Sequence, residues 1–269
     1  MSQRLVRTMR RLPVIFAAAL LFIVAGAAWF AIDATAQQRA PLPGISERPV
    51  ELDEFEQRVR DFLLEHPEVI MEAVQLLQER QRAAEAEGLK RTIAARRDEI
   101  FNDPSAPAGG NPSGDITVVE FFDYNCAYCR RVATTLAEVE EADTNLRIVY
   151  KEFPILGPGS QFAARAALAA QKQGAYVPFH IALMRAQEQL SEANVMAVAT
   201  TVGLDTELLR QDMDDPAIED AIARNLELAE VLGITGTPSF VIGEQIVPGA
   251  IDRRTLERLI AGARQDRRS

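Results

Sequence analysis

The spacing of hydrophobic and polar residues divides the chain into an apolar start, a helical part and an α/β part. Residues 12–32 form an uncharged apolar run. Between residues 50 and 101 the apolar residues recur at helical spacing, and His66-Pro67 separates two predicted helices because a residue before proline disfavours the helical region. Residues 116–122 form a β-branched and aromatic run, which is typical of a strand buried on both faces.

The rest of the chain alternates between helical and strand patterns. A helix is predicted to begin at Cys126, and a strand to span residues 146–153. Residues 155–232 carry helical signals only, and their predicted helix starts and stops are Ser160, Ser191, Asp205, Asp215, Gly174, Gly203 and Gly233. A β-hairpin over residues 239–247 and a helix from 253 to about 263 follow. This order predicts an α/β fold whose sheet carries a helical insertion at about residues 155–232.

The apolar start predicts export. Residues 1–11 contain four Arg and no acid, and Ala34-Thr35-Ala36 has the small-x-small pattern of a signal-peptidase site. We therefore expect residues 1–36 to be a signal peptide that sends the chain through the inner membrane to the periplasm. The 21 residues of the apolar run are also enough for an uncleaved anchor. Residues 37–49 are Pro-rich and aperiodic, as expected of a linker.

The helical part, residues 50–101, carries an apolar stripe on a mostly charged surface. The stripe consists of Phe55, Val59, Phe62 and Leu63 in the first helix and Ile70, Val74 and Leu77 in the second. Two helices with so few large apolar residues cannot bury a core alone. We expect them to form a homo-oligomer; packing against the chain's own α/β domain and a solvated spacer are the alternatives. Three Pro and three Gly over residues 102–114 indicate a boundary, so residues 102–269 form the second domain.

Composition and charge narrow the class of protein. Of the 269 residues, 48% are hydrophobic and 25% are charged, as in an ordinary globular protein. The formal net charge of −10 argues against nucleic-acid binding, which depends on clustered Lys and Arg. With only two Cys and two His, a scaffold of several disulfides is excluded, and a Cys/His zinc site within one chain would need all four residues.

The two cysteines, Cys126 and Cys129, lie where the predicted strand gives way to a helix. A disulfide between them would close too small a loop to stabilise the fold strongly, so a chemical use is favoured. The first turn of a helix stabilises a thiolate, the form that attacks disulfides. Cys129 would lie one turn further along the same face. We therefore predict that Cys126 is the exposed attacking residue and Cys129 the resolving one; an inert local bridge and half of an intermolecular metal site are the alternatives.

Three segments of the sequence match a known family. They are V-V-E-F-F-D-Y-N-C-A-Y-C-R-R, Y-K-E-F-P-I-L-G-P-G-S and G-I-T-G-T-P-S-F-V-I-G, beginning at Val118, Tyr150 and Gly233. The chain resembles the DsbA-like branch of the thioredoxin superfamily, in particular the ScsC-type periplasmic thiol-disulfide proteins. The resemblance covers about residues 102–264, and more weakly residues 50–101. It implies a thioredoxin fold with a helical insertion, preceded by a helical oligomerisation extension that forms trimers in some members.

The resemblance also implies roles for individual residues. Thr237-Pro238 matches the cis-proline loop that faces the cysteines and pairs with the substrate backbone. Glu120 matches a buried acid below the active site, and Lys151 a lysine near it. A buried carboxylate with a raised pKa accepts the proton of Cys129 during resolution. The alternative for Glu120 is a structural ion pair with Lys151.

Other side chains near the motif have two interpretations. Tyr124 and Tyr128 flank Cys126 and either line an apolar substrate rim or pack normally. His66 and His180 lie outside the motif, so we expect surface or core packing for both.

One departure from the family bears on the direction of the reaction. Strongly oxidising members have Pro-His between the cysteines, whereas this chain has Ala127-Tyr128. Without the histidine the reduced form is stabilised less, and we expect a reduction potential between roughly −120 and −200 mV. The threonine before Pro238 also resembles isomerising members. These points favour a disulfide isomerase or reductase over a dithiol oxidase.

The sequence leaves further functions to be compared. We expect no cofactor besides the redox-active pair Cys126-Cys129, and the expected partners are unfolded or misoxidised periplasmic proteins and a membrane redox partner. Two soft thiolates also suit Cu(I), and the resembled proteins are linked to copper tolerance, so copper binding is an alternative function. A chaperone that does not use its thiols is a third possibility, in which Cys126→Ala would keep full activity.

Overall fold

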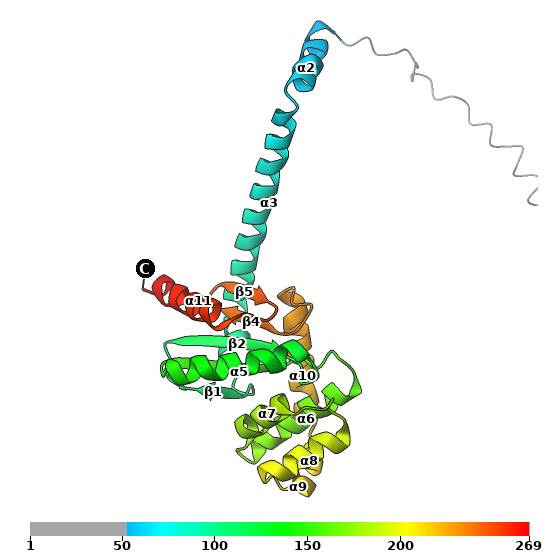
Figure 1. Ribbon diagram of the computed structural model, residues 1–269, viewed down its shortest axis with the longest axis vertical. Helices are drawn as coiled ribbons and strands as arrows, with labels where there is room; N and C mark the ends of the chain where they lie inside the picture. Colours follow the sequence, from blue (N-terminus) through cyan, green and yellow to red (C-terminus); the bar gives the residue numbers. More distant parts are fainter. Residues whose placement is uncertain (1–52, 269) are drawn as a thin grey trace, which may run out of the picture. The chain divides into compact units, whose positions relative to one another are not determined.

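The computed structural model describes residues 53–268, which are divided into two compact units, the first ending at Val69 and the second beginning at Ile70. The predicted signal peptide and the linker, residues 1–49, lie outside the described residues. Figure 1 shows the elements along the chain. Within residues 53–268, none of the helices combines the length and apolar character needed to cross a membrane.

In the first unit, α2 (Glu54–Glu65) begins at Asp53, whose side chain accepts hydrogen bonds from the first backbone N–H groups. It ends at His66, before Pro67, as predicted. Nothing in this helix is buried, and its apolar Phe55, Val59 and Phe62 are all exposed. The next helix, α3 (Glu68–Ala95), belongs to the second unit from Ile70 on, and it exposes Ile70, Met71, Val74, Leu76 and Leu77.

The second unit is built on a five-stranded sheet with the order β1-β3-β2-β4-β5. The strands are β1 (Ala108–Gly110), β2 (Ile116–Phe122), β3 (Leu146–Glu152), β4 (Ser239–Ile242) and β5 (Gln245–Pro248). Strands β2 and β3 are parallel, and the other pairs are antiparallel. The buried central strand that the apolar run predicted is β2, which lies between β3 and β4.

Helices cover both faces of the sheet (Figure 1). They are α4 (Arg97–Phe101), α5 (Ala127–Ala142), α6 (Pro158–Lys172), α7 (Tyr176–Arg185), α8 (Glu192–Val202), α9 (Thr206–Asp212), α10 (Pro216–Val231) and α11 (Arg253–Asp266). The first core joins one sheet face to α5, α11 and the insertion, which runs from α6 to α10. The second core joins the other face to α4, the end of α3 and the end of α10.

The second core includes the end of the helical part, through Ile93, Ile100 and Phe101. These side chains pack with Val119 and Phe121 of β2, and none of the five is more than 7% exposed. Residues 70–101 of the predicted extension belong to the same compact unit as the sheet, and their last part contributes to its core.

One local prediction was wrong, and one strand was missed. Ser160 does not begin a helix: Gly157 precedes Pro158 at the first position of α6, and the buried Ser160 instead donates a hydrogen bond to Asp123. The sequence also gave no sign of β1, which lies inside the Pro- and Gly-rich boundary. The predicted starts at Ser191, Asp205 and Asp215 are confirmed.

Candidate redox site at Cys126 and Cys129

Cys126 lies at the junction between β2 and α5, as predicted, and is the N-cap residue of the helix. Its sulfur accepts a hydrogen bond from the backbone N–H of Cys129, with an N–S distance of 3.3 Å. The N–H groups of the first helical turn have no partner within the helix, and the positive end of the helix dipole lies there. The position therefore favours a negative charge on the Cys126 sulfur.

The two cysteines are free thiols and differ little in exposure. Cys126 is 6% exposed and Cys129 is fully buried. The prediction of an exposed Cys126 was thus wrong, although Cys126 is the more accessible residue of the two. The Cys126 thiol donates to the backbone oxygen of Thr237 at 3.3 Å, and the Thr237-Pro238 peptide bond is cis. The cysteine motif and the Thr237-Pro238 loop, predicted from distant parts of the chain, are therefore brought together here.

Glu120 lies in the centre of β2 and is fully buried, and neither carboxylate oxygen has a hydrogen-bond partner. Burial raises the pKa of Glu120 to about 8. Burial also raises the pKa of Cys129, and the charge of Glu120 raises it further. Glu120 and Cys129 thus interact electrostatically inside the protein.

Lys151 is not part of this arrangement, so its predicted place in the site was wrong, and so was the alternative in which it pairs with Glu120. In the register of the sheet, Glu120 lies opposite Tyr150, and Lys151 lies opposite Phe121. Because successive side chains of a strand point to opposite faces, Lys151 lies on the other side of the sheet from Glu120. Its ammonium group is 2.8 Å from Asp103 Oδ2 instead.

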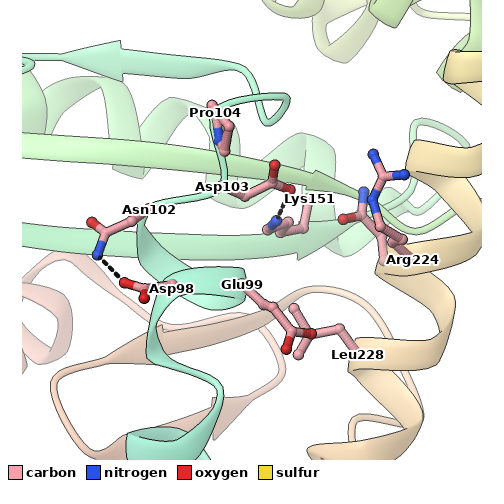
Figure 2. Close-up of a pocket in the computed structure, with 9 residues that line it drawn as sticks. Asp98, Glu99, Asn102, Asp103, Pro104, Lys151, Arg224 and Leu228 are labelled. Carbon is pink, nitrogen blue, oxygen red and sulfur yellow. Dashed lines mark hydrogen bonds and ion pairs between the residues drawn. The ribbon is translucent and has the colours of Figure 1, made fainter.

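Figure 2 shows the surroundings of Lys151. The lysine lies in a pocket of about 260 Å³ that is lined by Asp98, Glu99, Asn102, Asp103, Pro104, Lys151, Arg224, Asn225 and Leu228. Neither cysteine lines this pocket, so the structure gives Lys151 no contact through which to take part in thiol chemistry.

Tyr124 is buried and packs inside the protein, so it does not line a substrate rim. Its hydroxyl donates to Glu152 at 3.0 Å, and the hydroxyl of Tyr176 donates to the same oxygen at 2.7 Å. His180 Nδ1 lies 3.1 Å from the Tyr124 hydroxyl. Burial lowers the pKa of His180 to about 3, so this histidine is a neutral core residue. The sequence analysis missed Glu152, although a second acid in a mostly apolar strand was a signal for it.

The remaining flanking residues are exposed. Tyr128 is 57% exposed, and the guanidinium of Arg131 lies 5.1 Å from the centre of its ring. This exposure leaves Tyr128 available to a substrate. His66 pairs with Glu68 at the surface.

The turn before Cys126 is held by a second buried acid that sequence reasoning missed, Asp123. Its carboxylate accepts hydrogen bonds from Asn125 N at 2.7 Å, Leu156 N at 2.9 Å and Ser160 Oγ at 2.7 Å. These bonds fasten the end of β2 to the start of the insertion. Within residues 53–268, no group of three or more His, Cys, Asp and Glu side chains is arranged to hold a metal ion.

Comparisons with known proteins agree with this geometry. A family model described as the DSBA-like thioredoxin domain matches residues 117–261, more than half of the chain, and one for the N-terminal domain of the copper resistance protein ScsC matches residues 52–84. A thioredoxin-like oxidoreductase from Silicibacter pomeroyi is 52% identical over 63% of this chain and 98% of its own, with a TM-score of 0.62. The catalytic domain of Proteus mirabilis ScsC is 30% identical over 65% of this chain and 98% of its own, with a TM-score of 0.61.

Curated relatives match a similar part of the chain. A Na(+)/H(+) antiporter NhaA from Salinispora tropica is 29% identical over 57% of this chain. The match spans only 24% of that protein's length, about a quarter. The resemblance to the antiporter therefore concerns one segment of it.

Proposed function

Because the chain belongs to the family of DSBA-like thioredoxin domains, we propose that it is an exported thiol-disulfide oxidoreductase that exchanges disulfides with proteins through Cys126 and Cys129. The observation that carries this proposal is the position of the Cys126 sulfur. It lies at the start of α5, within 3.3 Å of both the Cys129 N–H and the Thr237 carbonyl.

The first step is an attack by the Cys126 thiolate on a substrate disulfide. A bond forms between Cys126 Sγ and one substrate sulfur, and the substrate's own S–S bond breaks, releasing its other sulfur as a thiolate. The N–H groups at the start of α5 stabilise the Cys126 thiolate before the attack. The carbonyl of Thr237, beside that sulfur, offers a backbone acceptor to the substrate chain, a mode of binding that tolerates many sequences.

The second step releases the substrate. Cys129 gives up its proton and attacks Cys126 Sγ, forming the Cys126-Cys129 disulfide while the bound substrate sulfur leaves as a thiolate. The unpartnered carboxylate of Glu120 is the nearby group suited to take this proton. In the reverse direction the same steps put a disulfide into a substrate.

A trapping experiment tests this mechanism. Cys129→Ala removes the resolving thiol, so the variant is expected to accumulate a mixed disulfide with a disulfide-bonded protein. Cys126→Ala, its matched control, is expected to form none. Mass spectrometry of the unreduced products measures both. Trapping by Cys126→Ala, or the absence of any adduct with Cys129→Ala, contradicts the proposal.

The direction we favour is isomerisation or reduction rather than dithiol oxidation, since Ala127-Tyr128 supplies no imidazole beside Cys126. Scrambled ribonuclease distinguishes these modes, because an isomerase restores its activity in the presence of a small amount of thiol. The substrates would be misoxidised or unfolded periplasmic proteins, and a membrane protein would reset the redox pair. The basic start and the Ala-x-Ala site of residues 1–36 support the periplasmic location.

We further propose that the chain forms a homo-oligomer through residues 50–101, with a trimer as the candidate assembly. Exposed apolar side chains on α2 and α3 support this, since an apolar stripe on a charged helix is stabilised by a partner. The match of residues 52–84 to an ScsC N-terminal domain model is consistent with a separate module here.

Copper binding is the second candidate function. It is supported by two free thiols within one helical turn and by the description of the model that matches residues 52–84. Titration of the reduced protein with Cu(I), at sub-micromolar free metal, tests it. Stoichiometric uptake that is lost in Cys126→Ala supports this function, and no uptake at that level contradicts it.

A further inference from the structure

Arg130 follows Cys129 in the first part of α5, and its side chain reaches three backbone carbonyls. Nε donates to the Tyr124 carbonyl at 2.8 Å, in the turn before Cys126. Nη1 donates to Ala186 and Nη2 to Glu188, both at 3.1 Å, in the loop between α7 and α8. A single side chain therefore joins the redox helix, the turn that precedes it and a loop of the insertion.

Asn125 holds the same junction from the turn. Its side-chain oxygen accepts from Leu190 N at 2.8 Å, and its side-chain nitrogen donates to the Leu190 carbonyl at 3.3 Å. Helix α6 lies so close to this loop that a Cβ on Gly159 would be 2.1 Å from the Leu190 carbonyl oxygen. The loop over residues 186–190 is thus fixed against the turn by two side chains, and against α6 by a close backbone approach.

Arg130 also forms hydrogen bonds to the backbone on both sides of Asn125, at Tyr124 and at Cys126. The bond from its side chain ends at Tyr124, before Cys126, and its backbone N–H donates to the Cys126 carbonyl at 3.1 Å. The orientation of Cys126 relative to the first turn of α5 is therefore held from both sides. The three carbonyls that Arg130 binds are uncharged, so these bonds leave its positive charge without a compensating carboxylate.

We propose that Arg130 is a positioning residue of the redox site, which keeps the Cys126 sulfur aligned with the N–H groups at the start of α5 by fastening the turn to the loop over residues 186–190. This rests on the proposed thiol-disulfide function. Without the junction the turn moves relative to the helix, the Cys126 thiolate loses part of its stabilisation, and the disulfide form becomes more favoured.

In a simpler role, the positive charge of Arg130 would stabilise the Cys126 thiolate without any effect on position. Substitutions distinguish this charge effect from the proposed positional effect. Lysine keeps the charge but lacks the planar fork that reaches several acceptors at once. A charge effect between groups that water can reach weakens strongly at about 1 M salt, whereas a positional effect does not.

The experiment compares Arg130→Lys and Arg130→Gln with Arg131→Gln, in the full chain. Arg131 is the neighbouring exposed arginine and serves as the matched control for net charge. The equilibrium constant for oxidation by glutathione and the pH profile of Cys126 alkylation are measured at low salt and at about 1 M salt. Both Arg130 variants are expected to shift the equilibrium about tenfold toward the disulfide, which corresponds to about 30 mV. Arg131→Gln is expected to stay within about twofold of the wild type.

Several outcomes overturn the proposal: wild-type behaviour of Arg130→Lys, disappearance of the Arg130→Gln shift in high salt, or an equal shift in Arg131→Gln. If an Arg130 variant does not fold, as judged by circular dichroism, Asn125→Ala tests the same junction with Arg130 intact, and it must shift the equilibrium in the same direction. Failure of Cys129→Ala to trap any mixed disulfide would instead remove the proposed function itself.

Discussion

Two buried carboxylates on one face of the sheet, Glu120 and Glu152, differ in what surrounds them. Glu152 accepts hydrogen bonds from two tyrosine hydroxyls, while Glu120 has none. An unpartnered carboxylate in the interior is costly when ionised, so Glu120 keeps its proton far above its ordinary pKa. The sequence predicted that Glu120 was unusual because it interrupts an apolar strand. It could not tell which acid was paired, because the partners of Glu152 come from distant segments.

The raised pKa of Glu120 makes stability depend on pH. The folded protein holds this proton up to a pKa of about 8, whereas the unfolded chain releases it near the ordinary value of 4.5. Between these values the folded state binds more protons, so its stability falls as pH rises. Glu120→Gln removes this loss. Its free energy of unfolding relative to the wild type is expected to rise by about 3 kcal/mol from pH 5 to pH 8.

Urea unfolding of both proteins at several pH values measures this difference. Burial also raises the pKa of Glu152, although its two tyrosine partners oppose that shift, so Glu152→Gln is expected to show a pH dependence of the same sign. A difference for Glu120→Gln that does not change between pH 5 and pH 8 would mean that Glu120 titrates normally. Glu120→Gln is also expected to resolve mixed disulfides more slowly than the wild type, because Cys129 loses its proton acceptor.

The position of Lys151 shows why the partner of a side chain could not be predicted from the sequence alone. Alternation along a strand assigns Tyr150 and Lys151 to opposite faces, but only the register between β2 and β3 decides which of them shares a face with Glu120. The true partner, Asp103, lies in the predicted domain boundary, where nothing marks one acid above another.

The Lys151-Asp103 pair is expected to act on stability and not on redox chemistry. Asp103→Ala leaves the ammonium group, which is 1% exposed, without a partner, and is expected to cost about 3 kcal/mol. Lys151→Met leaves the Asp103 carboxylate unpaired, but this side chain is 18% exposed and water can reach it, so the substitution is expected to cost less. Combining both changes should be milder than Asp103→Ala alone. Urea unfolding measures the loss in the free energy of unfolding of the three variants. A change in the glutathione equilibrium of any of them would mean that Lys151 acts on the redox site.

At the scale of elements, sequence signals were reliable where they act locally. Ser191, Asp205 and Asp215 begin helices because their side chains accept from N–H groups two or three residues ahead. Ser160 failed as a start because its hydroxyl is used by Asp123, 37 residues earlier in the chain. Strand β1 was missed for a similar reason: Ala-Gly-Gly has no preference for a strand, and its pairing with β3 alone creates one.

The contact between α6 and the loop before α8 gives a test at this scale. Gly159→Ala would place a Cβ 2.1 Å from the Leu190 carbonyl oxygen, so that the backbone has to move. We expect it to lower the free energy of unfolding by about 2 kcal/mol. Gly262→Ala, in α11, meets nothing within 4 Å and is expected to be neutral or stabilising by up to about 1 kcal/mol. Equal effects of the two substitutions, measured by thermal unfolding, would mean that the α6 contact is not tight.

For the whole molecule, the boundary between the helical extension and the sheet domain does not lie at the Pro- and Gly-rich stretch where the composition changes. The Pro- and Gly-rich stretch after Phe101 suggested a boundary, yet Ile93, Ile100 and Phe101 contribute to a core with β2. The sequence pattern identified the apolar face of these helices correctly but could not say which of its residues pack within the chain. A deletion of residues 50–101 would therefore expose one face of the sheet, and it would confuse a loss of assembly with a loss of folding.

Substitutions in α2 give a cleaner test of self-association. Phe55 and Phe62 are 65% and 50% exposed, and α2 has no buried residue, so charged side chains there leave the core intact. Phe55→Glu with Phe62→Glu is expected to reduce the mass in solution from an oligomer to one chain, because two carboxylates would have to be buried in the interface. Light scattering after size-exclusion chromatography measures the mass, with Arg58→Glu as a control for added negative charge on the same helix.

Self-association also changes what the redox site can do. In an oligomer several Cys126 thiolates act on one substrate, so a mixed disulfide that escapes one site meets another at a high effective concentration. The double variant is therefore expected to react at the wild-type rate with a small disulfide but to lose a larger part of its activity on scrambled ribonuclease. If the wild type already has the mass of one chain, the apolar stripe of α2 does not mediate self-association. If the double variant keeps full isomerase activity as a monomer, assembly has no part in the reaction.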